Sequence, residues 1–513
     1  MAVNMPRLLI SAAHKSSGKT TLSIGLCAAL HGRGLVVQPY KKGPDFIDPM
    51  WLSLACERPC HNLDFYLMTH AEMHATFTTH ARLTDISLIE GNKGLYDGLD
   101  LDGSNSNAAL ATLLQAPVIL VVDARGMTRG IAPLILGYQA FDRNIRIVGV
   151  ILNQLGGSRH ESKLRAVIEH YTDVPVLGAV HHDARMAIVE RHLGLMPSNE
   201  ASEARTKIAT IARLVTEQVD LDRVATMARQ APMLPAVSAT HADSALTQSI
   251  PAGASEKHVR PFADADIQRT SATTPSHFPR RVETIIKIGI ARDAAFAFYY
   301  PGDLDALRAH GAELIPFDTL HDARLPDVDA LFIGGGFPEV HMHALEANVD
   351  LRTDIRRVID AGMPVYAECG GLMYLTRSLS WQGECCAMVG ALPADTVMHA
   401  KPQGRGYVRL RETAQYPWPH SDTDTHEIRA HEFHYSRLEN IAPGLEYAYE
   451  VIRGAGIDGR HDGIVYKNVL ACYAHMRDLA GNHWARRFIE YIRQKRQIGT
   501  IGIRTTPAAT RKH

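Results

Sequence analysis

One cysteine and one histidine in the second half of the chain have the surroundings that a nucleophile and its base need. Cys369 follows the apolar run MPVYAE and precedes Gly370 and a helical pattern, which predicts a sharp strand-to-helix turn that exposes the sulfur. His475, in NVLACYAHMRD, stands near the end of another expected strand. A histidine near a thiol can take and return its proton, so the pair indicates nucleophilic attack on a carbonyl. A buried structural cysteine is the alternative interpretation.

Glycine-rich backbone follows a further expected strand of the same half. In FIGGGFPE (332–339), Gly335 and Gly336 leave the backbone free to direct an N–H group at a developing oxyanion. Gly370, next to the candidate nucleophile, is the third candidate donor. These glycines favour acyl-transfer chemistry over a purely structural cysteine.

A phosphate-binding loop opens the first half. The segment AHKSSGKT (13–20) lies between an apolar strand pattern and a helical pattern, the context that a P-loop requires. Its backbone N–H groups would surround phosphates, Lys19 would contact the outer phosphates, and Thr20 can hold Mg²⁺. An ordinary tight turn is the alternative. A partition-type switch ATPase is disfavoured, because His14 occupies the place of that class's second lysine.

Two acidic segments follow the P-loop. KKGPDFIDP (41–49) contains Asp45 and Asp48, and IEGNKGLYDG (89–98) contains Glu90 and Asp97. Each carboxylate alone is equally well explained as a helix cap or a solvated charge. Beside a P-loop they favour Mg²⁺–nucleotide chemistry, because protein-bound Mg²⁺ takes one or two carboxylates together with phosphate oxygens.

These motifs require two sheets to position them. From Leu8 to about Gln230, β-branched runs alternate with helical patterns, which predicts βαβ units and a buried parallel sheet. A second α/β pattern begins at IIKIGIARD (285–293). Between them the chain is rich in Pro, Ala, Ser and Thr and poor in aromatics, which predicts a disordered linker. We expect domains at 1–230 and 284–500, a linker at 231–283, and a frayed tail at 501–513.

Composition restricts the partners. Lys and Arg number 54 against 55 Asp and Glu, so no basic excess exists to favour nucleic acid. The longest apolar run, 116–122, is too short to cross a bilayer, and no signal peptide is visible, so we expect no membrane partner. Seven cysteines, an odd number in a large chain, favour reduced thiols and a cytoplasmic location.

The full motif set resembles the cobyrinic acid a,c-diamide synthase family. The resemblance rests on GKTT, KKGPDFIDP, RPCHNLD (58–64), EGNKGLYDG and VILN (150–153), and on the Cys369 and His475 segments, which resemble class I glutamine amidotransferases. It implies an α/β protein with a P-loop parallel-sheet ATP-binding domain, similar to dethiobiotin synthetase, and a class I glutamine amidotransferase-like α/β domain. The implied activity is amidation of the a- and c-side-chain carboxylates of cobyrinic or hydrogenobyrinic acid, a tetrapyrrole, with ATP, Mg²⁺ and glutamine.

The resemblance also implies roles for individual residues. ATP binding would fall to Gly18, Lys19, Thr20, Thr21 and Asn153, with Asn153 toward adenine; Mg²⁺ to Thr20, Asp45 and Glu90; and the tetrapyrrole to Asp48, Lys93, Tyr96 and Asp97. HEFHYS (431–436), whose spacing is not that of a zinc-protease helix, would face the substrate. Arg477 replaces the glutamate that class I enzymes carry two residues after the histidine, which implies a Cys369–His475 dyad.

Two alternatives stay open at this point. His14-Lys15 and Asn92-Lys93 depart from the family pattern, and sirohaem or sirohydrochlorin is the rival substrate for the same chemistry. A nucleotide-dependent switch with an inactive amidase half is the non-enzymatic alternative, which the intact Cys369 and His475 disfavour. A homodimer is the hypothesis for the assembly.

Overall fold

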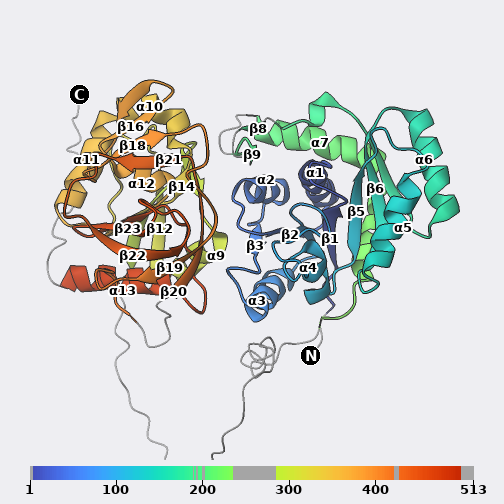
Figure 1. Ribbon diagram of the computed structural model, residues 1–513, viewed down its shortest axis with the longest axis horizontal. Coiled ribbons are helices and arrows are strands. Elements are labelled where there is room, and N and C mark those ends of the chain that lie inside the picture. Colours follow the sequence, from blue (N-terminus) through green and yellow to red (C-terminus); the bar gives the residue numbers. More distant parts are fainter. Residues whose placement is uncertain are drawn as a thin grey trace, which may run out of the picture.

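The computed structural model describes residues 4–188, 190–191, 194–198, 203–234, 285–420 and 427–497. Two α/β bodies lie side by side, one from each half of the chain (Figure 1). The expected linker from residue 235 onward and the expected tail at 501–513 lie outside the described residues. Among the described residues, no helix has both the length and the apolar character needed to cross a membrane.

The first body is built on a seven-stranded parallel sheet in the order β3-β2-β4-β1-β5-β6-β7. The strands are β1 (Arg7–Ala12), β2 (Val37–Lys42), β3 (His61–Leu63), β4 (Ile86–Glu90), β5 (Val118–Asp123), β6 (Ile147–Leu155) and β7 (Val176–His181), and a short hairpin adds β8 (Glu190–Arg191) and β9 (Gly194–Leu195). Most of the sheet is buried on both faces, which explains its near-continuous apolar runs.

Helices cover both faces of this sheet. One face packs against α1 (Lys19–Gly32), α2 (Ile47–Cys56), α7 (Ala204–Gln218) and α8 (Leu221–Arg229); the other packs against α3 (His70–Ala81), α4 (Asn107–Leu113), α5 (Ile131–Phe141) and α6 (Ser158–Tyr171). The body continues past residue 230, because Leu234 is buried and the carbonyl of Pro232 accepts a hydrogen bond from Arg7 (2.6 Å).

The second body has a nine-stranded sheet in the order β12-β10-β13-β15-β24-β23-β22-β19-β20, parallel from β12 to β24 and antiparallel beyond. Its strands are β10 (Ile286–Ala291), β12 (Ala312–Phe317), β13 (Ala330–Ile333), β15 (Val365–Glu368), β19 (Gly404–Glu412), β20 (Glu427–His434), β22 (Glu446–Arg453), β23 (His461–Tyr466) and β24 (Val469–Cys472). The expected combination of two α/β domains is confirmed.

Smaller elements complete this body. The pair β11 (Phe296–Phe298) and β14 (Gly335–Gly336) is antiparallel, and a four-stranded sheet contains β16 (Ser378–Trp381), β17 (Glu384–Ala387), β18 (Asp395–Met398) and β21 (Ser436–Glu439). One face of the large sheet packs against α9 (Pro301–Ala309) and α13 (Trp484–Gln497); the other side holds α10 (Met342–Ala347), α11 (Val349–Asp360) and α12 (Gly370–Leu375).

The two bodies share part of one apolar core. Phe46, in the loop between β2 and α2, stacks on Phe298 with ring centroids 5.4 Å apart and contacts the rings of Tyr300 (4.4 Å) and His475 (4.8 Å). All four side chains are buried. Because Phe46 lies beside Asp45 in sequence, this contact places an acidic loop of the first body against the candidate base of the second.

Candidate active site

Cys369 occupies a tight turn between β15 and α12. Its φ of 48° and ψ of −103° are strained for a residue with a side chain, as expected where a strand turns abruptly into a helix to present a nucleophile. The Cys369 N–H donates to the carbonyl of Cys472 on the neighbouring strand β24 (2.7 Å), which fixes the turn.

The predicted glycines surround this turn, and close contacts explain why they are glycines. A Cβ added at Gly370 would lie 3.0 Å from the Gly336 nitrogen, and one added at Gly335 would lie 2.6 Å from Cε1 of His475. Gly335, Gly336 and Gly370 are therefore grouped around Cys369 and His475. Their role as oxyanion donors stays a prediction.

His475 is buried just beyond β24, and a carboxylate that the sequence analysis overlooked lies next to it. Oε2 of Glu368 is 3.4 Å from Nδ1 of His475, an ion-pair distance without the alignment of a good hydrogen bond. The other oxygen of Glu368 accepts from the Tyr366 hydroxyl (2.6 Å) and the Met476 N–H (3.0 Å). The structure thus adds to the predicted Cys369–His475 pair a carboxylate from the residue before the nucleophile.

The electrostatics of His475 follow from these neighbours. Burial acts to lower its pKa, but contacts with Cys369 and the Glu368 carboxylate outweigh burial and raise the pKa to about 10. The imidazolium form is therefore favoured at neutral pH, which suits a histidine that stabilises a thiolate and later donates a proton.

Arg477, at the position of the missing glutamate, has a structural task between the two bodies. It is buried, its guanidinium lies over the Tyr300 ring (4.7 Å), and one nitrogen approaches the Asn62 carbonyl (3.4 Å) and the Met68 sulfur (3.2 Å). Asn62 in turn donates to the carbonyl oxygens of Gly43 (2.8 Å) and Asp45 (2.7 Å). Arg477 therefore connects the segment that contains His475 to the loop of the first body that contains Asp45.

The P-loop has the geometry that the motif predicts. Gly18 has φ 80°, and a Cβ there would collide with Nδ2 of Asn153, which donates to the Ser17 carbonyl (2.9 Å). A small cavity of about 100 Å³ beside the loop is lined by Gly18, Thr21, Asn153, Gln154 and the segment 181–187, among others. This place next to the loop is consistent with the predicted position of Asn153 toward a nucleotide base.

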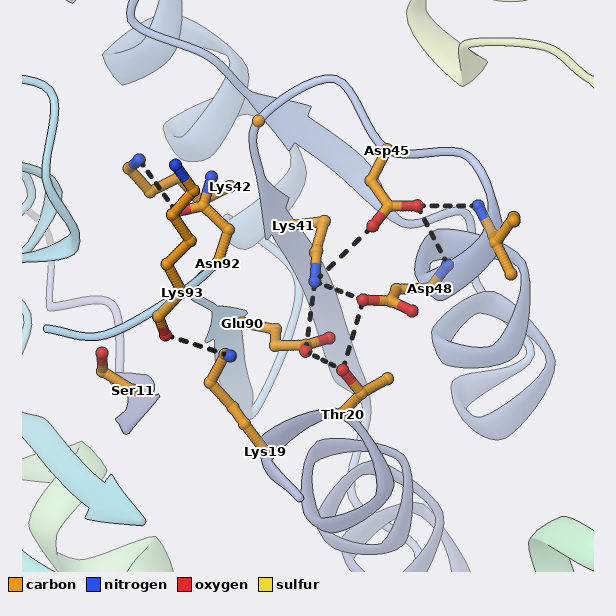
Figure 2. Close-up of polar contacts among 12 residues, drawn as sticks. Ser11, Lys19, Thr20, Lys41, Lys42, Asp45, Asp48, Glu90, Asn92 and Lys93 are labelled. Atoms are coloured by element: carbon orange, nitrogen blue, oxygen red, sulfur yellow. Dashed lines mark hydrogen bonds and ion pairs between the residues drawn. The ribbon is translucent and has the colours of Figure 1, made fainter. Parts of the chain in front are cut away.

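Three carboxylates surround one buried lysine at the carboxyl ends of β2 and β4 (Figure 2). Nζ of Lys41 lies 2.5 Å from Asp48, 3.1 Å from Glu90 and 3.8 Å from Asp45. The Thr20 hydroxyl donates to Glu90 (2.6 Å) and lies 3.2 Å from an Asp48 oxygen. The structure thus groups Asp48 with the predicted metal residues, and its assignment to the tetrapyrrole side stays a prediction. Lys41 was not singled out from the sequence.

This acidic group fits a divalent cation. Burial raises the pKa of Asp45 to about 7, helped by neighbouring Asp48, and burial also raises the pKa of Glu90. Burial alone would lower the pKa of Lys41, but the three carboxylates outweigh the effect of burial and raise this pKa. One Glu90 oxygen is buried without a hydrogen-bond partner. Negative charge beyond what Lys41 neutralises, with an unpartnered oxygen, suits Mg²⁺.

A cavity of about 1080 Å³ is lined by residues of both bodies; of the acidic group, Asp45 belongs to its lining, whereas Thr20, Lys41, Asp48 and Glu90 do not. Its lining includes Cys369 and His475 from the second body and Asp45, Lys93 and Asp97 from the first. His431 and Phe433 of HEFHYS also line it, as the resemblance implied.

Lys93 and Tyr96, both predicted at the substrate, have different positions. The Lys93 carbonyl accepts from the Lys19 ammonium (3.3 Å), so its loop connects this cavity to the P-loop. Tyr96 is not part of the lining; it contacts Tyr138 and Phe141 on α5, and its hydroxyl donates to the Tyr138 carbonyl (2.6 Å). The assignment of Tyr96 to the substrate stays a prediction that these contacts do not support.

Comparisons with known proteins agree with this arrangement. Residues 9–195 match the CobQ/CobB/MinD/ParA nucleotide binding domain, and residues 287–482 match the CobB/CobQ-like glutamine amidotransferase domain. A nucleotide-binding domain and a glutamine amidotransferase domain that share one cavity define a glutamine-dependent amidoligase.

Relatives of nearly the same length identify one family within this class of enzymes. Cobyrinate a,c-diamide synthase of Magnetococcus marinus is 45% identical over 488 residues, which cover 94% of this chain and 97% of that protein. The enzyme of the same name from Archaeoglobus fulgidus is 38% identical over 497 residues, covering 97% and 99%. The chain belongs to the cobyrinate a,c-diamide synthase family.

Proposed function

We propose that the protein converts the a- and c-side-chain carboxylates of cobyrinate into amides, with ATP as the energy source and glutamine as the nitrogen donor. The shared cavity supports the proposal, because Cys369 of the second body and Asp45 and Lys93 from the acidic loops of the first body line the same space. The names of the relatives supply the substrate.

In the first body, a substrate carboxylate oxygen attacks the γ-phosphorus of ATP, and ADP leaves. Lys19 neutralises charge on the transferred phosphoryl group, and the P-loop backbone binds the phosphates. Thr20, Asp45, Asp48 and Glu90 would hold Mg²⁺, which supplies electrostatic stabilisation of the phosphates when bound. The product, an acyl phosphate, is an electrophile that ammonia can attack.

In the second body, the Cys369 thiolate attacks the glutamine side-chain amide, and backbone N–H groups stabilise the oxyanion. His475 donates a proton to the leaving ammonia, and water then hydrolyses the thioester to glutamate. Glu368 orients His475 and stabilises its imidazolium form. Ammonia crosses the shared cavity, displaces phosphate from the acyl phosphate, and forms the amide.

The alternatives are less well supported. Relatives named for cobyrinate favour a corrinoid over sirohaem or sirohydrochlorin. The joint cavity and the His475 surroundings argue against a switch with an inactive amidase half. A homodimer and a cytoplasmic location stay predictions.

Mass spectrometry of the product tests the proposal. Incubation with ATP, Mg²⁺, glutamine and cobyrinate is expected to replace two carboxyl groups by amides, whereas sirohaem and sirohydrochlorin are expected to stay unchanged. Cys369→Ala should abolish the reaction with glutamine but retain it with ammonium salts, while Cys385→Ala, at an exposed cysteine, should retain both. Lys19→Ala should lose amidation from either nitrogen source. Diamidation of sirohaem in place of cobyrinate would contradict the substrate assignment.

A further inference from the structure

Three arginines of the second body line the shared cavity, where it meets the first body. Arg405 lies on β19, Arg429 on β20, and Arg453 at the end of β22, and all three are exposed to this space. No carboxylate among the described residues forms an ion pair with any of them. Their neighbours Arg409 and Arg411 on β19, by contrast, pair with Glu427 or Glu450.

Aromatic rings hold these guanidinium groups in place. Arg429 and Arg453 lie over the ring of Tyr66 at 5.5 Å and 5.8 Å, and Arg405 lies over Phe433 at 5.4 Å. Stacking on a ring restrains a guanidinium while most of its N–H donors stay available in the ring plane. The three arginines are therefore preorganised donors without an anionic partner.

The rings themselves are anchored across the boundary between the bodies. Tyr66, from the first body, stacks on Tyr407 of the second with centroids 4.4 Å apart. The Tyr407 hydroxyl donates to Asp64 of the first body (2.8 Å), and Arg429 donates to the Tyr66 carbonyl (3.3 Å). This group of arginines and tyrosines exists only when both bodies are together.

The three arginines, which lie apart on the cavity lining, favour an anion with several separated charges. A guanidinium pairs with a carboxylate through two parallel hydrogen bonds, and three of them around a cavity of about 1080 Å³ suit a large polycarboxylate better than one compact anion. Lys42 and Lys93 of the first body also line the cavity and add positive charge to it. A tetrapyrrole with peripheral acetates and propionates has this form, and only some of its carboxylates react.

We propose that Arg405, Arg429 and Arg453 bind peripheral carboxylates of the macrocycle that are not amidated, and thereby turn the reacting side chains toward the P-loop body. The inference rests on the proposed function and deepens it: the amidotransferase body supplies part of the tetrapyrrole site as well as ammonia. The arginines act as positioning and specificity residues and take no part in bond making.

Direct binding to the full-length protein, measured by calorimetry with cobyrinate in the absence of ATP and glutamine, tests this assignment. Arg429→Ala and Arg453→Ala should each weaken binding by about tenfold to a hundredfold, the range for loss of a charge-assisted contact. Arg429→Lys should recover part of the affinity. Arg411→Ala, at a paired arginine of the same sheet, is the matched control and should bind as the wild type does.

Two further measurements separate this effect from damage to the fold or to the catalytic groups. Glutamine hydrolysis and the KM for ATP should stay unchanged in Arg453→Ala while the KM for cobyrinate rises. Cobyrinate with all its carboxylates esterified should bind weakly, and equally, to the wild type and to Arg453→Ala.

Wild-type affinity for cobyrinate in the Arg429→Ala/Arg453→Ala double variant would overturn the inference. If the wild type binds sirohydrochlorin but not cobyrinate, the substrate in the proposed function is wrong. The same variants measured with sirohydrochlorin then decide whether the arginines bind its carboxylates.

Discussion

At the scale of single residues, the chemistry depends on charges that burial brings close together. Glu368 is buried at the end of β15, and one of its oxygens faces His475 while the other is fully occupied by Tyr366 and Met476. A carboxylate held this firmly is suited to orient the imidazole and to favour its protonated form.

Removing this charge should weaken the glutaminase reaction. Glu368→Gln keeps the shape but lowers the pKa of His475, so the thiolate–imidazolium pair loses stability at neutral pH. We expect glutamine-dependent kcat/KM to fall by roughly tenfold to a hundredfold, and alkylation of Cys369 by iodoacetamide at neutral pH to slow. Ammonia-dependent amidation should be unaffected.

A second glutamate–histidine pair provides the control. Glu384 pairs with His343 at 2.7 Å on the surface of the same body, and Glu384→Gln should change neither reaction. An unaltered pH profile of alkylation in Glu368→Gln would show that His475 is oriented by other groups.

Asp45 should make metal binding depend on pH. Its pKa of about 7 means that below this pH a proton occupies the carboxyl group, and a cation has to displace it. Apparent Mg²⁺ affinity in the presence of ADP should therefore fall by about tenfold per pH unit below about pH 7 and level off above it. Titration calorimetry across this range measures the effect.

Asp45→Asn should bind Mg²⁺ more weakly and lose this pH step. Asp102→Asn, at an exposed carboxylate, should retain it. A step of equal size in Asp45→Asn would assign the titrating group to another residue.

At the scale of elements, strand ends predicted from the sequence account for most of the site. Lys19, Cys369 and His475 follow an apolar strand, and Glu90 is the last residue of one. Parallel strands bring their carboxyl ends to one edge of each sheet, so a linear pattern was sufficient to find these residues. The contacts of Asp48 with Lys41 and Thr20 could not be predicted because Asp48 lies in the first turn of α2, where only tertiary contacts decide which way a side chain points.

Other residues had weaker signals in the sequence. Glu368 reads as the polar end of an apolar strand, and its function depends on a histidine more than a hundred residues away. The cavity arginines belong to antiparallel strands, where alternation predicts exposure but cannot distinguish solvent from a cavity. Tyr96 lies in a motif of the family, yet its ring packs against α5.

The loop between β2 and α2 should couple the two reactions. It presents Asp45 to the acidic cluster and Phe46 to the His475 ring. Phe46→Leu keeps an apolar side chain but loses aromatic contacts worth about 1 kcal/mol. The position of His475 should then depend less on the conformation of the loop that contains Asp45. We expect more glutamate released per amide formed, measured by parallel assays of both products.

Leu54→Ala, at a partly buried position on α2 that packs against the same core, controls for general loosening of this region. It should leave the ratio of glutamate to amide as in the wild type. An unchanged ratio in Phe46→Leu would show that the coupling runs through other contacts.

At the scale of the whole molecule, the site is a property of the pair of bodies. Cys369 of the second body and Asp45 of the first line one cavity. Arg429 and Arg453 lie over the ring of Tyr66 from the first body. Arg477 connects the segment that contains His475 to the acidic loop through Asn62. Neither half alone contains the complete arrangement.

Because the apolar core continues from one body into the other, the amidotransferase domain cannot be exchanged for that of another enzyme without loss of core contacts. Phe298, Tyr300 and Phe337 belong to the second body but are buried in the core of the first. Cutting the gene between residues 234 and 285 would leave these rings, and the charge of Arg477, facing water in a separate amidotransferase fragment. Such a fragment should aggregate alone and stay in solution when produced together with the first half. An amidotransferase domain from another enzyme would lack the matching surface, so a chimaera would have to inherit these contacts along with the nucleophile.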